Sequence, residues 1–142
     1  MVIGVFSHDP GGAEILSSYI KKRKIRPVYC VSGPAIKIFK KKLSIKKNLS
    51  FDEVFKISSS IICSTSGLSD LEYKAIKEAN QKQLKSVAII DHWINYKERF
   101  TRNNKTVLPD EIWVTDKYAL DKSKKLFKKS KLKLIKNYYF LD

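Results

Sequence analysis

The sequence predicts a three-layer α/β domain with a mostly parallel sheet, and three observations support this prediction. Short apolar runs rich in Val and Ile alternate with stretches of helical periodicity, as in repeated strand-helix units. The strand runs are continuously apolar, which is typical of strands buried on both faces. With 142 residues, of which 43% are hydrophobic, the chain is expected to form a single domain over residues 1–142.

The first part of the chain shows two strand-helix units. Strands are expected at Val2–Phe6 and Pro27–Val31, and helices at Gly12–Lys24 and Ala35–Lys42. In both helical stretches apolar side chains recur at helical spacing, so that one face of each helix is apolar.

The middle of the chain contains the clearest helix signal. Ser69 and Glu72 have the spacing of a capping box, and an apolar stripe follows them. Residues 44–60 are expected to be mainly loop, with a short strand at Val54–Phe55. The remaining expected elements are strands and one helix, at Ser60–Cys63, Lys85–Ile90, Glu111–Thr115, Asp116–Lys129 (the helix) and a short strand after Leu132.

The charge is strongly positive. The chain contains 29 Lys and Arg against 14 Asp and Glu, which gives a formal net charge of +15. A potential of this sign attracts phosphate, nucleic acid or anionic lipid. Lys dominates over Arg, and the chain is rich in Ile and Asn, which is also the composition that an A+T-biased genome imposes. A functional basic face and a compositional origin therefore both stay open.

Several classes of protein do not fit the composition. No apolar run approaches the ~20 residues of a membrane span, and the N-terminus leads directly into a strand pattern, so a cytoplasmic protein is expected. Cys30 and Cys63 lie inside strand runs and are expected to be buried free thiols. No zinc-spaced set of residues is present, so the sequence implies no metal site and no cofactor.

Two turns after strands are candidate anion sites. His8 to Ala13 includes Asp9, Gly11 and Gly12 at a strand-to-helix turn, where small residues and exposed amides favour the approach of a phosphate. The alternative is a tight turn that needs glycine for its geometry alone. Thr65, Ser66 and Gly67 repeat the arrangement one unit later, with hydroxyl groups beside a helix start.

The only two histidines, His8 and His92, both follow predicted strands and adjoin aspartates, Asp9 and Asp91. A histidine held by a carboxylate is suited to act as a general base toward a hydroxyl group. We therefore predict catalytic roles for His8, Asp91 and His92, although packing of a histidine without a role remains the alternative.

The loop from Asp91 to Phe100 concentrates aromatic, amide and cationic groups after a strand. Trp93, Asn95, Tyr96 and Arg99 are expected to contact a ligand, because the loop is too polar for packing alone. Asp116 follows the next strand. Because ligands of parallel α/β sheets bind outside the carboxyl ends of the strands, all these residues are expected to line one site.

As a set, these segments resemble the N-terminal domain of GT-B-type glycosyltransferases and the related nucleotide-sugar 2-epimerase group, in particular bacterial polysaccharide-biosynthesis proteins. The resemblance covers almost the whole chain. It is carried by the segments Ser7–Ala13, Thr65–Gly67 with Asp70–Glu72, Asp91–Tyr96 with Arg99–Phe100, and Leu108–Asp116.

The resemblance implies a Rossmann-like domain that forms the acceptor-side half of a GT-B enzyme. In that family the loop after the first strand faces the interdomain cleft and often holds a histidine that acts as base toward the acceptor hydroxyl; His8 is at the matching position. The segments above cover only the N-terminal domain of that family, whose C-terminal domain supplies most nucleotide-sugar contacts, so the 142 residues alone are expected to be inactive. Three interpretations stay open: a piece of a longer enzyme, a subunit completed by a separate donor-binding chain, or a relic with a binding role. The implied partners are a nucleotide sugar or sugar acceptor and, in the second interpretation, a donor-binding subunit.

An alternative from a different class is a non-catalytic basic α/β module that binds nucleic acid or an anionic membrane surface. The chain has no aromatic RNA-binding strand and no clamp loop, which argues against nucleic acid. An anionic membrane would place the protein at the periphery of the inner membrane face.

Overall fold

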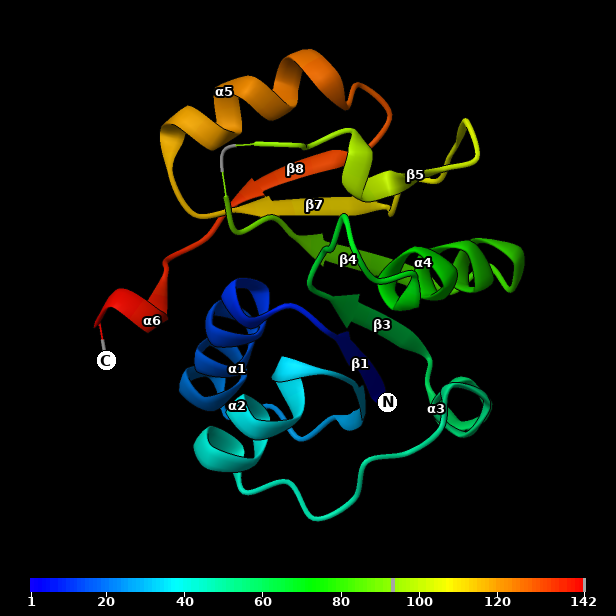
Figure 1. Ribbon diagram of the computed structural model, residues 1–142, viewed down its shortest axis with the longest axis vertical. Helices are drawn as coiled ribbons and strands as arrows, with labels where there is room; N and C mark the ends of the chain where they lie inside the picture. The colour runs from blue at the N-terminus through cyan, green and yellow to red at the C-terminus, as the bar shows by residue number, and fades with distance from the viewer. Residues whose placement is uncertain (93, 142) are drawn as a thin grey trace.

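The computed structural model describes residues 1–92 and 94–141 and shows a six-stranded sheet in which every strand pairing is parallel. The strand order is β2-β1-β3-β4-β7-β8, so β1 lies in the interior of the sheet as expected (Figure 1). The strands span Ile3–Ser7 (β1), Val28–Val31 (β2), Ser60–Cys63 (β3), Lys85–Ile89 (β4), Glu111–Val114 (β7) and Lys131–Leu134 (β8).

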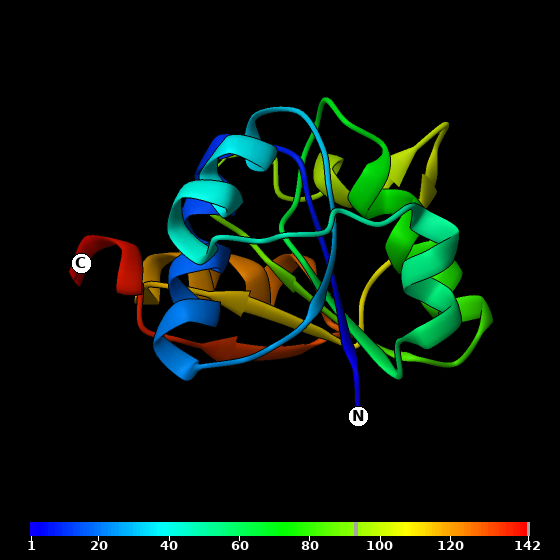
Figure 2. The same cartoon turned by 90° about the horizontal axis from the view of Figure 1, so that it is seen from below.

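Helices cover both faces of this sheet, which confirms the predicted three-layer, Rossmann-like α/β architecture. Figure 2 shows α1 and α2, in blue and cyan, on the opposite side of the sheet from α3 and α4, in green. The helices span Pro10–Arg23 (α1), Pro34–Leu43 (α2), Phe51–Ile57 (α3), Leu71–Gln81 (α4), Lys117–Leu126 (α5) and Tyr138–Leu141 (α6).

Two hydrophobic cores follow from the alternation of side chains along the strands. Val5 packs with α1 and α2 on one face, whereas its neighbour Phe6 packs with Val54 and Phe55 of α3 on the other. The same alternation places Ile112 and Val114 in the core that contains α4 and α5. The continuously apolar strand runs thus serve two cores at once.

The predicted short strand at Val54–Phe55 is wrong, because these residues belong to the helix α3. Ser50 accepts the main-chain N–H of Glu53, and the Glu53 carboxylate accepts the N–H of Ser50, so that a complete capping box begins the helix. Val54 and Phe55 are buried on one side of α3. The capping box was the sequence signal for a helix here.

The polar segment after β4 contains more structure than a loop. A short 3₁₀ helix (η1, Glu98–Phe100) leads into a two-stranded antiparallel hairpin, β5 (Thr101–Arg102) and β6 (Lys105–Thr106). Tyr96 and Phe100 are buried in the core on the α4 and α5 side, where both rings approach Phe127. This packing holds the segment against the sheet.

The outer edge of β2 is closed by a side chain. The Asn48 amide accepts the main-chain N–H of Val31 and donates to its carbonyl oxygen, both at 2.8 Å. The N–H of Leu49 donates to the carbonyl of Tyr29. Residues that were expected to be loop therefore satisfy the backbone groups of an edge strand.

Among the helices of residues 1–92 and 94–141, none has the length and hydropathy needed to cross a membrane.

Glycine determines how closely α1 approaches the sheet. A Cβ atom at Gly12 would lie 2.5 Å from the Cβ of Ser64, directly after β3, whereas a Cβ at Gly67 would meet nothing within 4 Å. Gly12 therefore permits the contact between the start of α1 and the end of β3 that builds the carboxyl edge of the sheet.

We expect Gly12→Ala to lower the free energy of unfolding by about 1–3 kcal/mol, because the added methyl group has no space beside Ser64. Gly67→Ala is the matched control and should change the stability by less than about 0.5 kcal/mol. Urea denaturation of both variants measures this difference. Equal stability of the two variants would contradict the close-packing role of Gly12.

Candidate functional site

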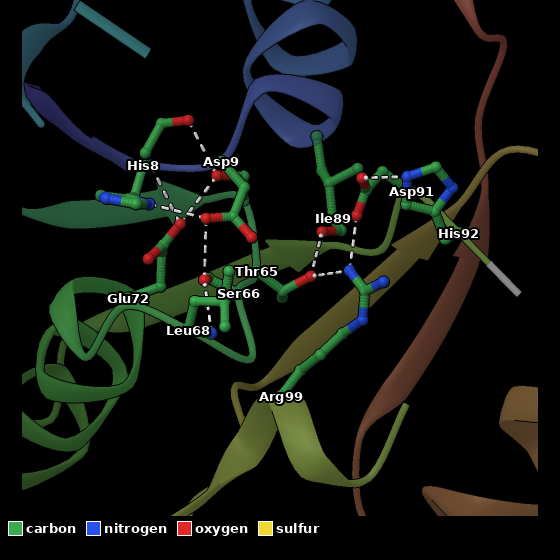
Figure 3. A network of polar contacts seen from close by, with 12 residues as sticks. His8, Asp9, Thr65, Ser66, Leu68, Glu72, Ile89, Asp91, His92 and Arg99 are labelled. Carbon is green, nitrogen blue, oxygen red and sulfur yellow. Dashed lines mark hydrogen bonds and ion pairs between the residues drawn. The ribbon is translucent and has the colours of Figure 1, made fainter. Parts of the chain in front are cut away.

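The polar residues that follow β1, β3 and β4 meet at the carboxyl edge of the sheet, as Figure 3 shows. His8 and Asp9 follow β1, Thr65 and Ser66 follow β3, and Asp91 comes soon after β4. Hydrogen bonds connect Asp9 to Ser66 and, through Arg99, Thr65 to Asp91. The structure thus brings together residues that are up to 91 positions apart in the sequence.

His8 and Asp9 form a hydrogen-bonded pair. The Nδ1 atom of His8 lies 2.6 Å from Oδ1 of Asp9, which also accepts the hydroxyl of Ser66 at 2.8 Å. With Nδ1 bound to a carboxylate, Nε2 of His8 is the nitrogen that remains to accept a proton. The His8 side chain is 27% exposed, and a Cβ atom at Gly33 would lie 2.5 Å from Nε2. The absence of a side chain at Gly33 thus lets the His8 ring pack directly against the main chain there.

A buried carboxyl group holds the main chain at the same point. Oε2 of Glu72 accepts the N–H of His8 at 3.1 Å and the hydroxyl of Ser64 at 2.9 Å, while Ser64 contacts the hydroxyl of Ser7. Glu72 is only 2% exposed, and its Oε1 has no hydrogen-bond partner among the described residues. Burial raises the pKa of Glu72, and the nearby charge of Asp9 raises it further, while the hydrogen bonds from Ser64 and His8 oppose the shift.

The predicted capping box of Ser69 and Glu72 is therefore wrong. The N-cap residue of α4 is Asp70, whose side chain makes no capping hydrogen bond, and the Ser69 hydroxyl accepts the N–H of Leu71. Glu72 points toward the end of β1 instead. Its position one helical turn before Ala75 and Ile76, which are buried, was the available signal that this carboxyl group faces inward.

An ion pair between Arg99 and Asp91 lies at the same edge of the sheet. The guanidinium of Arg99 donates to Asp91 at 2.5 Å and to the hydroxyl of Thr65 at 2.9 Å, and Thr65 donates to the carbonyl of Ile89. The side chains of Arg99 and Asp91 are 8% and 5% exposed. His92 is 68% exposed, and its Nε2 lies 3.3 Å from Oδ2 of Asp91. This geometry assigns Asp91 mainly to Arg99 and leaves the His92 ring open to solvent.

The start of α1 is already surrounded by carboxylates. Asp9 precedes the helix, and Asp91 lies so close to Gly11 that a Cβ atom there would overlap its Oδ2. A phosphate at this helix end would meet the carboxylates of Asp9 and Asp91, and the guanidinium of Arg99 is already paired with Asp91, which reduces the attraction of the helix dipole. The geometry therefore favours close packing as the reason for Gly11 and Gly12.

Two adjoining cavities open at this edge. One, of 280 Å³, has Ile15 and Tyr139 as its apolar walls and includes Asp116 and Asn137. The other, of 460 Å³, includes Asp9 and Glu98. Gly11, Asp91 and His92 line both cavities. A ligand that extends from one cavity to the other would pass over these three residues.

The structure places the predicted site residues differently with respect to the two cavities. His8 lies at the same edge of the sheet but lines neither cavity. Trp93 lies outside the described residues. Four others are buried and line neither cavity, namely Gly12, Thr65, Ser66 and Tyr96. The residues that line one or both cavities are Asp9, Gly11, Gly67, Asp91, His92, Asn95, Arg99 and Asp116.

Several contributors to the site were not found from the sequence. Glu72, Gly33 and Arg102 act on the turns that carry His8 and Ser66, and Asn137 and Tyr139 complete one cavity from the far end of the chain. No cluster of three or more His, Cys, Asp or Glu that could hold a metal ion occurs within residues 1–92 and 94–141.

Compared with protein-family models, curated proteins and solved structures, the chain has no match. The assignment of a function therefore depends on the geometry of the carboxyl edge.

We expect the stability of the protein to depend on pH through Glu72. Because its pKa is raised in the folded state, the folded protein binds this proton more tightly than the unfolded chain does. The contribution of Glu72 to stability therefore increases as the pH falls through the raised pKa toward the unfolded value of 4.5, and is lost as the pH rises again. Glu72→Gln removes this contribution.

Urea denaturation of the wild type and of Glu72→Gln at several pH values between 5 and 8 tests this expectation. Subtracting the two curves removes the effects of the other titrating groups, which both proteins share. The stability of the wild type relative to the variant should rise as the pH falls. A difference that is independent of pH would show that Glu72 titrates alike in the folded and unfolded states.

Proposed function

We propose that this chain is the acceptor-side half of a glycosyl-transferring enzyme, with His8 as the general base. The observation that carries the proposal is the 2.6 Å hydrogen bond between Nδ1 of His8 and Asp9 at the end of β1, which leaves Nε2 to accept a proton. The resemblance of the segments around His8 and Asp91 to the N-terminal domain of GT-B enzymes supports the same role.

His8 lines neither cavity, but its partner Asp9 lines the one of 460 Å³, so in this proposal the acceptor extends from that cavity past Asp9 toward His8. The acceptor hydroxyl loses its proton to Nε2 of His8 while its oxygen forms a bond to the anomeric carbon of the donor sugar. The bond between that carbon and the phosphate oxygen breaks, and its electron pair leaves with the nucleotide. Asp9 stabilises the imidazolium that forms and keeps Nδ1 protonated throughout. General-base assistance of this kind contributes roughly 10²–10⁴-fold to a rate.

The cavities suit a ligand with hydroxyl groups better than a phosphate. Asp91, Asp116 and Asn137 provide oxygen atoms that accept hydrogen bonds from hydroxyl groups, and Ile15 and Tyr139 provide an apolar wall. The carboxylates of Asp9 and Asp91 at the start of α1 repel an anion. The nucleoside diphosphate of a donor sugar would accordingly be bound by a second, donor-binding unit.

A second candidate, a non-catalytic module on an anionic membrane surface, is favoured by one observation. The segment 117–136, which includes α5 and β8, contains nine lysines and a single acidic residue, Asp121. Leu126 and Leu134 are exposed in the same segment. Lysines near a membrane surface each contribute about 1 kcal/mol of attraction to anionic lipid.

Saturation-transfer NMR with a panel of hexoses, N-acetylhexosamines and hexuronic acids tests the acceptor role on the whole chain, with UDP and inorganic phosphate as competing probes. At least one sugar should bind, and Asn137→Ala should weaken it roughly 2–10-fold through the loss of one hydrogen-bonding group. Lys77→Ala, on α4 and away from both cavities, is the control. Binding of phosphate or anionic vesicles without binding of any sugar would favour the second candidate.

With the sugar identified, transfer is measured after addition of a donor-binding unit. His8→Ala should lower turnover by roughly 10²–10⁴-fold while sugar binding and the folded NMR spectrum are retained. Full turnover of His8→Ala would exclude His8 as the base.

A further inference from the structure

Asp9 is held in place by two side chains rather than one. A single oxygen, Oδ1, accepts hydrogen bonds from His8 at 2.6 Å and from the Ser66 hydroxyl at 2.8 Å. In Figure 3 Asp9 lies between the two residues. Asp9 therefore connects the imidazole after β1 with the loop after β3.

The hydrogen-bonding capacity of the Ser66 hydroxyl is fully used. It donates its one proton to Asp9, and its oxygen accepts the main-chain N–H groups of Leu68 and Ser69 at 3.0 and 2.9 Å. Ser66 itself is buried, so water has little access to its hydroxyl group. The position of this hydroxyl group depends on the shape of the loop from residue 66 to residue 70.

Arg102, in the hairpin after η1, fixes that loop. Its Nη2 donates to the carbonyl oxygens of Ser66 and Ser69, and its Nε donates to Asp70 at 2.7 Å. The remaining two donors go to the carbonyls of Glu98 and Thr101. All five N–H groups of the guanidinium are thus bound, which a lysine at this position could not reproduce.

The geometry points to Ser66 and Arg102 as positioning residues that hold His8 in its Nδ1–H tautomer through Asp9. A carboxylate fixed beside Nδ1 requires a proton on that nitrogen, which leaves the lone pair on Nε2, beside Gly33. The inference rests on the proposed function only in that Nε2 is the atom expected to take the proton of the acceptor.

The tautomer of His8 is measured directly by long-range ¹H–¹⁵N spectra of the whole chain without any ligand. The chain contains only two histidines, so His92→Ala assigns the signals of His8. The spectra are recorded at a pH well above the range in which imidazole titrates, so that the neutral tautomers are compared.

Ser66→Ala should lower the ratio of the Nδ1–H to the Nε2–H tautomer roughly fivefold, the effect of one ordinary hydrogen bond. Arg102→Lys should shift the ratio in the same direction by a smaller factor, because the hydroxyl remains but its loop is released. Ser69→Ala is the matched control and should leave the ratio unchanged. It removes a hydroxyl from the same loop, and within residues 1–92 and 94–141 the partner of that hydroxyl is the N–H of Leu71 alone.

An unchanged ratio in Ser66→Ala, in a protein whose backbone spectrum remains folded, overturns the inference. If Ser66→Ala does not fold, the test uses Arg102→Lys instead, and an unchanged tautomer ratio in that variant overturns the inference. A shift in Ser69→Ala as large as that in Ser66→Ala would also overturn it, because general loosening of the loop would then be the cause.

This experiment separates the inference from the proposed function. The tautomer is observed with no sugar present, so an unchanged ratio leaves glycosyl transfer standing and removes only the positioning role. Conversely, the expected shift together with full turnover of His8→Ala would leave the positioning of His8 established and exclude His8 as the base.

Discussion

The carboxyl edge of the sheet depends on one buried carboxyl group. Glu72 of α4 accepts the main-chain N–H of His8 after β1 and the hydroxyl of Ser64 after β3, and so connects two strands with the helix that follows them. Burying a carboxyl group is costly unless it is hydrogen-bonded. Here one carboxyl oxygen accepts a hydrogen bond from each of the two turns. The direction in which the His8 main chain leaves β1, and hence where its side chain lies, follows from this contact.

Most of the fold was predictable because it depends on local pattern. The strands of the six-stranded sheet and the long helices α1, α2, α4 and α5 were expected near their observed positions, since apolar periodicity and continuous apolar runs directly encode burial. The short elements η1, β5, β6 and α6 were not expected. At α3 the apolar pair Val54 and Phe55 suggested a strand, although the capping residues before it favoured a helix. In a helix of seven residues the cap carries more information than the apolar pattern.

The site was only partly predictable, for a physical reason. Residues directly after strands are brought to the same edge by any parallel sheet, so His8, Asp9 and Asp91 could be grouped without a structure. The residues that orient these side chains could not be found from the sequence. The contacts of Glu72, Gly33 and Arg102 depend on how helices and loops pack in three dimensions. The same packing explains why Thr65 and Ser66, which sequence alone suggested as ligand contacts, are buried and hold the framework of the site.

The two hydrogen bonds of Asn48 to Val31 of β2 affect how molecules of this protein can associate. The side-chain amide of Asn48 imitates a peptide group, so the backbone of Val31 is no longer available for pairing with a strand from another molecule. At the opposite edge, β8 presents Lys131 and Lys133, whose like charges repel a second copy of the same strand. One edge is thus closed by hydrogen bonding and the other by charge, and both devices protect a fully parallel sheet against edge-to-edge aggregation.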